Sequence, residues 1–404
     1  MRNALKRVQE NRGAPGIDGM TVEALPRFLS SEWPRIKSQL LEGEYRPLPV
    51  RRVEIPKPDG GVRLLGIPSV LDRLIQQATM QVLQASWDRT FSEHSFGFRP
   101  NRSAHGAVTK AQGYAMQGQR IVVDIDLEKF FDRVNHDILM GLVMKRVHDK
   151  AIIRLLRRYL AGGVLIGGLV SSTREGVPQG GPLSPLLSNL MLDVLDKELE
   201  SRGHTFVRYA DDCNIYVGSR HAGERVMASV TKFLAVKLKL RVNSDKSAVA
   251  PLHKRTFLGF SFTRDGKKVR IAPKSLMRLR EKVRELTSKT GGRSLDETIE
   301  NLSKYLRGWY GYFRLAQTPT TFENLDPWIR RRLRCLCWKQ WKTPKRRYSM
   351  LVTRGVSKET AALTTSAARR HGTWHLSMTP GLSWALRPDY LRSLGLFSLS
   401  SSSV

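Results

Sequence analysis

Apolar residues recur at three- and four-residue steps in two parts of the chain, which is the spacing of amphipathic helices. The first part, residues 70–87, begins close to Asp72, an acidic residue of the kind that stabilises a helix N-terminus. The second part begins at Ser275, and its third helical stretch is expected to start near Asp326 and Pro327, because proline is favoured in a first turn. Residues 271–404 are therefore predicted to form a helical domain.

Strand-forming residues in the first two thirds of the chain predict β-hairpins. Residues 48–68 carry an Asp-Gly-Gly turn signal between two such runs, and residues 206–218 place Asp211 and Asp212 at a bend. The first hundred residues as a whole are interpreted as short strands and loops, apart from the helix that begins near Asp72. Further short strands are expected in residues 237–251 and 256–273. The pattern predicts an α+β fold with a domain boundary near residue 271 and a frayed, serine-rich C-terminus.

The charge of the chain indicates what kind of partner the protein binds. The 404 residues are enough for two or three domains, and 68 lysines and arginines face 36 acidic residues, a formal net charge of +32. Such an excess requires a polyanion, and nucleic acid fits better than a membrane because no apolar run approaches the roughly 18 residues of a membrane-spanning helix. The N-terminus has no apolar core of a signal peptide, so a cytoplasmic location is expected, in the bacterial cytoplasm or nucleoid.

The helical region carries half of this charge, with 25 lysines and arginines against 9 acids. Its densest stretch, residues 328–348, interleaves cations with Trp328, Trp338 and Trp341, as a surface that neutralises phosphates and stacks bases would. A solvated charged helix face is the alternative. The three cysteines of the chain are too few for a disulfide framework or a four-ligand zinc site and are interpreted as small apolar residues.

Two acidic clusters stand in apolar, strand-like surroundings. One contains Asp124, Asp126, Glu128 and Asp132, and the other is the pair Asp211-Asp212. A carboxylate that is partly buried must be paired, hydrogen-bonded or bound to a cation, and Mg²⁺ prefers such oxygen ligands. Pairing with arginines, or an ordinary turn in the case of the second cluster, remains open from these residues alone.

The order of short motifs along the chain decides between these alternatives, because it resembles the order in a known family. The segments NRGAPGIDG, IPKPDGGVRLLGIPSVLDRLIQQA, FSEHSFGFRPNRSAHGA, DLEKFFDRVNH, EGVPQGGPLSPLLSNLML, RYADD, NSDKS and FLGFSF, followed by YLRGWYGYF and WIRRRLRCLCWKQW, closely resemble the reverse transcriptases encoded by bacterial group II introns. The resemblance covers nearly the whole chain. It implies a right-hand polymerase with fingers at 1–118 and a palm at 119–270, followed by an α-helical thumb and maturase domain at 271–404.

The resemblance also assigns roles to the acidic clusters. Asp126, Asp211 and Asp212 match the catalytic aspartates that hold two Mg²⁺ ions, for which Mn²⁺ can substitute, and the backbone carbonyl of Leu127 is a further metal ligand. Lys246 matches a lysine that donates a proton to the departing pyrophosphate. The other three acids of the first cluster are assigned structural roles.

Further positions match residues that contact the nucleotide or the nucleic acid. Lys57 and Arg63 are expected to hold the triphosphate, Phe131 to lie against the sugar and exclude a 2′-hydroxyl, and Gln179 and Gly180 to contact the incoming nucleotide and template. The expected contacts with nucleic acid are Arg99, Arg102, Arg330, Arg331, Arg332, Arg334, Lys339 and Lys342.

The resemblance implies two activities: RNA-directed DNA synthesis and maturase binding of a group II intron RNA that promotes splicing and retrohoming. The implied partners are the intron RNA, an RNA template with a DNA primer, dNTPs and a DNA target, with no membrane and with the oligomeric state open. The H-N-H pattern and cysteine pairs of the nuclease domain that many such proteins carry are not found in the sequence, so no second-strand cleavage is expected. The alternatives are a stand-alone bacterial reverse transcriptase, of the retron, diversity-generating or defence type, and a maturase that acts only in splicing.

Overall fold

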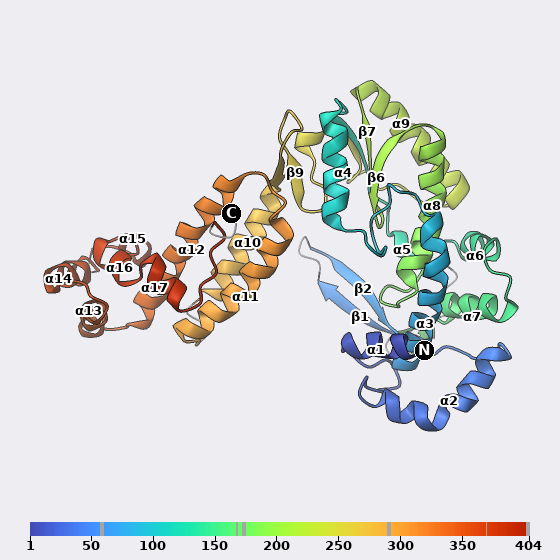
Figure 1. Cartoon of the computed structure of the whole chain (residues 1–404), viewed down its shortest axis with the longest axis horizontal. Coiled ribbons are helices and arrows are strands. Elements are labelled where there is room, and N and C mark those ends of the chain that lie inside the picture. Colours follow the sequence, from blue (N-terminus) through green and yellow to red (C-terminus); the bar gives the residue numbers. More distant parts are fainter. Residues whose placement is uncertain (57–59, 167–168, 172–174, 289–291, 369, 401–404) are drawn as a thin grey trace. The chain divides into compact units, whose positions relative to one another are not determined.

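The chain divides into two compact units, Met1–Arg255 and Thr256–Val404 (Figure 1). The computed structural model describes residues 1–56, 60–166, 169–171, 175–288, 292–368 and 370–400. Helices and sheets are mixed in the first unit and helices dominate the second, which confirms the predicted α+β class. The boundary between the units lies before residue 271 in the sequence, because a short hairpin packs with the second unit. The Phe260 ring lies 5.2 Å from that of Phe313, and the Gln317 backbone N–H donates to the Val269 carbonyl. The division of the first unit into fingers and palm stays a prediction.

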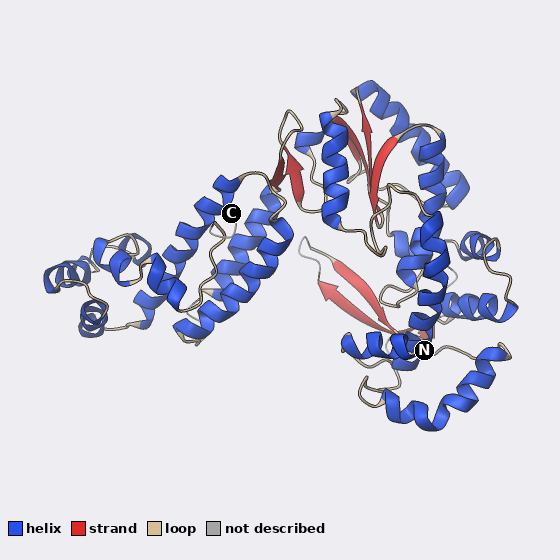
Figure 2. Ribbon diagram, viewed as in Figure 1, coloured by secondary structure: helices blue, strands red, loops and turns tan. Residues whose placement is uncertain are grey.

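An antiparallel sheet of order β6-β7-β3-β8 forms the centre of the first unit (Figure 2). Its strands are β3 (Ile121–Ile125), β6 (Thr205–Tyr209), β7 (Asp212–Val217) and β8 (Ala248–Pro251). The hairpin β6–β7 confirms the strands and the turn predicted in residues 206–218. Both predicted acidic clusters lie in or beside this sheet.

A second sheet has the order β2-β1-β4-β5. Its strands are β1 (Val50–Pro56), β2 (Val62–Ile67), β4 (Val164–Ile166) and β5 (Leu169–Ser171). The antiparallel pair β1–β2 confirms the hairpin predicted at residues 48–68, and β1 also pairs in parallel with β4.

Helices surround these sheets, and one of them confirms the first amphipathic pattern. Helix α3 (Val70–Trp87) begins where Ser69 accepts a hydrogen bond from the backbone N–H of Asp72, and its apolar face is buried. The remaining helices of the unit, apart from single turns, are α1 (Arg2–Glu10), α2 (Leu25–Leu41), α4 (Ala104–Met116), α5 (Phe130–Arg133), α6 (His136–Met144), α7 (Lys150–Ala161), α8 (Ser184–Ser201) and α9 (Arg220–Phe233).

One local prediction was wrong. The first hundred residues were expected to hold strands and loops outside α3, but they begin with α1 and α2, which become stable by packing Ala4, Val8 and Leu25 against α3. A short strand expected in residues 237–251 is present as β8, although residues 237 and 238 belong to a π-helical turn at the end of α9.

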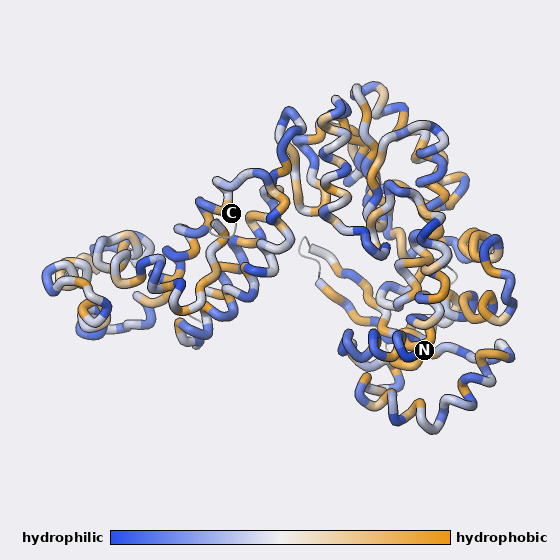
Figure 3. The backbone as a smooth tube through the Cα atoms, in the orientation of Figure 1, coloured by the Kyte–Doolittle hydropathy of each residue, from blue (hydrophilic) through white to orange (hydrophobic). Residues whose placement is uncertain are grey.

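The hydrophobic core of the first unit lies between the central sheet and α8. Figure 3 shows apolar residues concentrated along the strands of this sheet. Helix α8 is buried on almost every side, including polar positions such as Asn189 and Asp196. Because helix and sheet are both buried, their polar side chains must find partners inside the protein.

The second unit begins with the hairpin β9 (Phe260–Phe262) and β10 (Val269–Ile271) and continues as helices. These are α10 (Pro273–Leu286), α11 (Leu295–Phe313), α12 (Pro319–Gln340), α13 (Pro344–Thr353), α14 (Lys358–Ala367), α15 (Thr373–Leu376), α16 (Pro380–Ala385) and α17 (Pro388–Ser393). No helix in the described part of the chain is long and apolar enough to span a membrane.

Helix α12 differs from the sequence prediction at its start. The helix begins at Pro319, so Pro327 lies inside it and not in its first turn. Nor is the serine-rich C-terminus frayed as far as residue 400, because Asp326 accepts hydrogen bonds from the Leu399 and Ser400 backbone N–H groups at 3.0 Å each. The buried Asp326 therefore ties the last described residues to α12.

Candidate active site

The pairing of β3 with β7 brings the two acidic clusters together. Asp124 lies opposite Asn214 in this pair, and Asp126 follows the last residue of β3. Asp211 lies in the turn between β6 and β7, and Asp212 is the first residue of β7. The three expected metal-binding aspartates therefore lie at the same end of neighbouring antiparallel strands.

The carboxyls of the turn are held in an unfavourable electrostatic environment. The surrounding protein raises the pKa of Asp212 to about 7 by limiting its hydration, and the nearby charges of Asp211, Asp124 and Asp126 raise it further. Burial, and the charge of Asp126, also raise the pKa of Asp211. Carboxyls crowded in this way gain stability from a bound cation.

Asp124 and Glu128 have partners of a different kind. Arg255 donates to the Asp124 carboxyl at 2.9 Å, and Arg133 donates to Glu128 at 2.8 Å. Pairing with arginine, the alternative that the sequence left open, thus describes these two acids. This placement supports the structural role given to them.

Asp126 is positioned by the segment that follows α9. Its backbone N–H donates to the Ser247 hydroxyl at 2.9 Å, and its carbonyl accepts from the Asn243 N–H at 2.8 Å. The same segment brings the Lys246 ammonium to 3.9 Å from the Asp126 carboxyl. Lys246 is exposed there, within reach of a ligand held at the carboxylates.

The oxygen atoms of these aspartates suit a divalent cation whose remaining ligands come from the substrate. Among the described residues, no three His, Cys, Asp or Glu side chains are close enough together to hold a metal ion by themselves. Mg²⁺ typically uses one or two carboxylates together with substrate phosphates and water. The aspartates therefore offer a partial coordination shell, which a bound nucleotide would complete.

A cavity of about 560 Å³ is lined by four of the residues predicted to contact the nucleotide, Arg63, Phe131, Gln179 and Gly180. Arg63 lies on β2 and donates to the Gln179 side-chain carbonyl at 2.9 Å. The positive charge of Arg63 also lowers the pKa of Asp211, although burial outweighs it. The volume of the cavity is within the usual range for a site that binds a small molecule. Lys57 lies outside the described residues.

Arg99 corrects the prediction of nucleic-acid contact. Its guanidinium is buried and donates to the Ser95 carbonyl at 3.0 Å and to the Asp88 carboxyl at 2.8 Å. Arginine supplies several donors in one plane, and here they are directed at groups inside the protein. Arg102, which is half-buried with its guanidinium over the Phe96 ring, stays a predicted contact.

Three arginines of the basic stretch in α12 have partners within the second unit. Arg331 stacks on Trp374 with its guanidinium 3.8 Å from the ring centre, and Arg332 donates to the Thr287 hydroxyl at 3.1 Å. Burial lowers the pKa of Arg334, which lies 3.4 Å from the Leu386 carbonyl. The three side chains connect α12 to its neighbouring helices but are only half-buried, so their nucleic-acid contacts stay predictions.

Two of the three tryptophans of the same stretch are structural. Trp338 and Trp341 are buried in the core of the second unit, so they are not available to stack bases as predicted. Lys339 and Lys342 are exposed, Arg330 is half-buried, and their nucleic-acid contacts stay predictions. The three cysteines are buried and free, as interpreted from the sequence.

A buried ion pair escaped the sequence analysis. Arg208 of β6 and Asp196 of α8 are both fully buried and lie 2.6 Å apart. The available signals were an arginine within an apolar strand, directly before the tyrosine and alanine that precede Asp211, and an acid within an apolar helix.

Carboxylates at the ends of neighbouring strands are an arrangement suited to phosphoryl transfer, and the comparisons with known proteins give the class of the protein. A family model described as "Reverse transcriptase (RNA-dependent DNA polymerase)" matches residues 55–262, and one described as "Group II intron, maturase-specific domain" matches residues 276–354. The chain belongs to the reverse transcriptase family and carries the maturase domain of group II introns, which confirms the resemblance seen in the motifs.

Two relatives found by sequence agree with this assignment. Protein YkfC of Escherichia coli (strain K12) is 34% identical over 58% of this chain and 72% of that protein. Group II intron-encoded protein LtrA of Lactococcus lactis subsp. cremoris is 36% identical over 48% of this chain, and the match spans 32% of LtrA. Among solved structures, a partial Cas6-RT-Cas1--Cas2 complex is 26% identical over 59% of this chain and 42% of that chain, with a TM-score of 0.37.

The raised pKa of Asp212 predicts a stability that depends on pH and on metal. The folded state holds the Asp212 proton up to about pH 7, whereas the unfolded chain releases it near pH 4, so the folded state loses stability as the pH rises between these values. In metal-free buffer, Asp212→Asn is expected to raise the free energy of unfolding at pH 8 by roughly 1 kcal/mol, a value reduced for the exposure of the side chain, and to change it little at pH 4.

Thermal unfolding in the presence of a chelator or of Mg²⁺ checks this prediction. Mg²⁺ should stabilise the unmodified protein more at pH 8 than at pH 5, and the Asn variant less at both values. Asp137→Asn, at an exposed acid of α6, is the control and should show neither effect. A stability gain of the Asp212 variant that is equal at pH 4 and pH 8 would contradict the electrostatic explanation.

Proposed function

We propose that the protein is an RNA-directed DNA polymerase that adds dNTPs to the 3′ end of a DNA primer on an RNA template. The observation that carries this proposal is the placement of Asp126, Asp211 and Asp212 at the same end of β3 and β7. A cavity lined by Arg63 and Gln179 supports it. Two Mg²⁺ ions, or Mn²⁺ in their place, would supply activation of the primer hydroxyl and neutralisation of the leaving pyrophosphate.

The residues of the chain would divide the remaining work. Asp126, Asp211, Asp212 and the Leu127 carbonyl would hold the ions. Arg63 and Lys57 would bind the triphosphate, for which a forked guanidinium and an ammonium point charge are both suited. Gln179 and Gly180 would position the base pair that forms, and Lys246 would donate a proton to the pyrophosphate.

Phe131 provides a test of the sugar preference. The half-buried ring lines the same cavity as Arg63 and Gln179, and the family resemblance predicts a contact with the sugar. Phe131→Ala is expected to raise ribonucleotide use relative to deoxynucleotide use by roughly 10- to 100-fold, because the space for a 2′-hydroxyl opens. Primer extension on an RNA template, with each nucleotide class in turn, measures this ratio.

Phe98→Ala is the matched control, since Phe98 is an aromatic residue that lines the same cavity. Its variant should keep the preference for deoxynucleotides. If the unmodified protein extended no primer on RNA, the proposed function itself would be wrong, whereas an unchanged preference in the Phe131 variant would reject only the role of this ring.

We further propose that the second unit binds a group II intron RNA and promotes its splicing. The match of residues 276–354 to the maturase-specific domain, together with the basic charge of this region, supports the proposal. Recovery of the intron that contains this reading frame, when RNA bound to the protein in its native cells is sequenced, would support a maturase. Recovery of a short unrelated RNA would favour a stand-alone reverse transcriptase.

Exposed lysines at the end of α12 allow the RNA contact to be measured. Reversing the charge of Lys339 and Lys342 is expected to weaken intron RNA binding and to reduce the salt dependence of log K by about one unit for each phosphate that is no longer neutralised. Reversal of two exposed lysines in the first unit, Lys232 and Lys237, is the control. An unchanged salt dependence in the first variant would remove these lysines from the RNA interface.

A further inference from the structure

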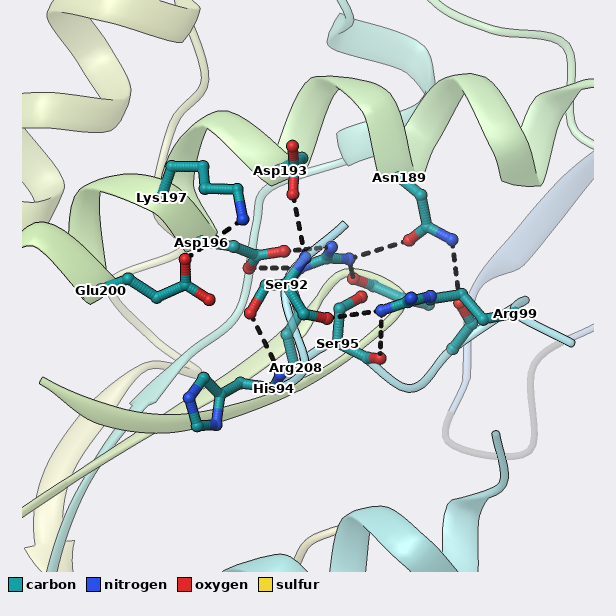
Figure 4. Close-up of polar contacts among 12 residues, drawn as sticks. Ser92, His94, Ser95, Arg99, Asn189, Asp193, Asp196, Lys197, Glu200 and Arg208 are labelled. Atoms are coloured by element: carbon teal, nitrogen blue, oxygen red, sulfur yellow. Dashed lines mark hydrogen bonds and ion pairs between the residues drawn. The ribbon is translucent and has the colours of Figure 1, made fainter. Parts of the chain in front are cut away.

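The buried guanidinium of Arg208 joins the helix behind the sheet to the turn that carries Asp211 (Figure 4). It donates to both carboxyl oxygens of Asp196, at 2.7 Å from Nε and 2.6 Å from Nη2. Its Nη1 donates to the Asn189 side-chain carbonyl at 3.0 Å and to the Ala210 backbone carbonyl at 2.8 Å. Buried ion pairs are rarely more stable than apolar residues of similar volume, so fold stability alone is a poor reason for an arginine here.

The contact with Ala210 bears directly on the catalytic turn. Ala210 has a φ of +57°, a left-handed backbone conformation that residues other than glycine seldom adopt. In the peptide unit between Ala210 and Asp211, the carbonyl accepts a hydrogen bond from Arg208 and the N–H is that of Asp211. One peptide plane therefore connects the Arg208 guanidinium to the backbone of Asp211.

The turn is confined from the opposite side as well. The Arg208 backbone N–H donates to the His94 carbonyl, and the Arg208 carbonyl accepts from the Phe96 N–H, both at 2.8 Å. Asn189 donates its side-chain amide to the Gly97 carbonyl at 2.9 Å. A Cβ at Gly97 would overlap the backbone of Ala210, so this segment lies directly against the turn. Rotation of the Ala210–Asp211 peptide would break the bond to Arg208 in a space with little room to relax.

We infer that Arg208, supported by Asp196 and Asn189 of α8, is a positioning residue that fixes the Asp211 carboxylate in the orientation needed to hold a divalent cation. The inference rests on the proposed polymerase function. Arg208 touches neither the cavity-lining residues nor the primer in this proposal, and it acts through the Ala210 carbonyl. Mg²⁺ demands nearly ideal octahedral geometry, so a small rotation of one carboxylate is expected to affect catalysis strongly.

The test is a double variant, Arg208→Met with Asp196→Leu, which removes both buried charges together and so avoids leaving one of them unpaired. The variant is expected to fold, as thermal unfolding and circular dichroism would show, yet to lose about 10- to 100-fold in kcat for primer extension with Mg²⁺. The half-saturating Mg²⁺ concentration should rise several-fold, and KM for dNTP should change by less than about twofold, because the nucleotide cavity is untouched. Mn²⁺ should restore more of the activity than it does in the unmodified protein.

A second ion pair on the same helix offers a matched control. Arg146 lies 3.3 Å from Asp193 of α8, and this pair does not contact the turn. Arg146→Met with Asp193→Leu should alter stability to a similar degree without changing the Mg²⁺ dependence. If both double variants shifted kcat and the Mg²⁺ dependence equally, the effect would be a general one of α8 and the inference would fail.

Arg208→Lys decides the matter independently, including the case in which the first double variant does not fold. Lysine keeps a charge beside Asp196 but cannot form the forked contact with the carboxylate and reach the Ala210 carbonyl at the same time. The inference predicts a weaker form of the same signature. Unchanged kcat and Mg²⁺ dependence in this variant would overturn it, whereas absence of extension by the unmodified protein would instead reject the proposed function.

Discussion

Asp211→Asn is expected to lower primer extension on an RNA template by at least about 1000-fold, which corresponds to roughly 4 kcal/mol of activation free energy. Asparagine preserves the shape of the side chain but removes the negative charge that a divalent cation needs. The folded state should be no less stable than before, because burial raises the pKa of this carboxyl and the charge of Asp126 opposes its ionisation. The affinity for intron RNA should stay within about twofold, since the basic helical unit is unaltered.

Single-turnover extension and an RNA-binding titration measure the two quantities on the same preparation. Asp132→Asn is the control, because this acid lies in the same segment as Asp126 and is not assigned to the metal. A weaker RNA affinity in the Asp211 variant would show that catalysis and RNA binding are not separate. Near-normal extension would remove Asp211 from the metal site.

The strands on either side of Asp211 were predictable because their signals are local. Residues 206–218 combine two strand-forming runs with a polar pair, and a hairpin can be formed without help from distant residues. These local patterns did not predict that Asp126 and Asp211 lie close together. Their proximity followed from the resemblance, and the register of β3 against β7 now gives it a physical basis.

The arginines show where such reasoning fails. A sequence shows that Arg99 and Arg331 are charged but not how far each side chain is buried. A guanidinium can donate hydrogen bonds to a buried carbonyl as well as to a phosphate. Arg99 is buried by contacts with Asp88 and Ser95 that no helical or strand period reveals. The same applies to Arg208, whose partners lie on another element and become adjacent only when α8 packs on the sheet.

Helices α1 and α2 were missed for different reasons. Helix α1 has 9 residues, too few for a long amphipathic pattern. Helix α2 has 17 residues with apolar positions at helical spacing, but it contains Pro34, and proline usually breaks a helix. Both helices are stabilised by packing against α3.

Gly180→Ala is the second change with a large expected effect. Gly180 has a φ of +118°, a region that is strained for any residue with a side chain, and a Cβ there would overlap the Gly66 carbonyl oxygen of β2. The Gly66 N–H donates to the Gln179 carbonyl at 2.7 Å, so the segment of Gln179 and Gly180 lies directly against β2 where both line the cavity. Alanine would have to push these two segments apart.

Strain of about 1–3 kcal/mol at such a position corresponds to a decrease of roughly 10- to 100-fold in kcat/KM for dNTP. We expect most of the decrease to come from KM, since Gln179 and Arg63 would move apart while the carboxylates of β3 and β7 stay in place. Gly141→Ala, in helix α6 with open space around its Cα, is the control and should leave extension unchanged. Steady-state extension with varied dNTP separates KM from kcat, and an unchanged KM in the Gly180 variant would show that this cavity does not bind the nucleotide.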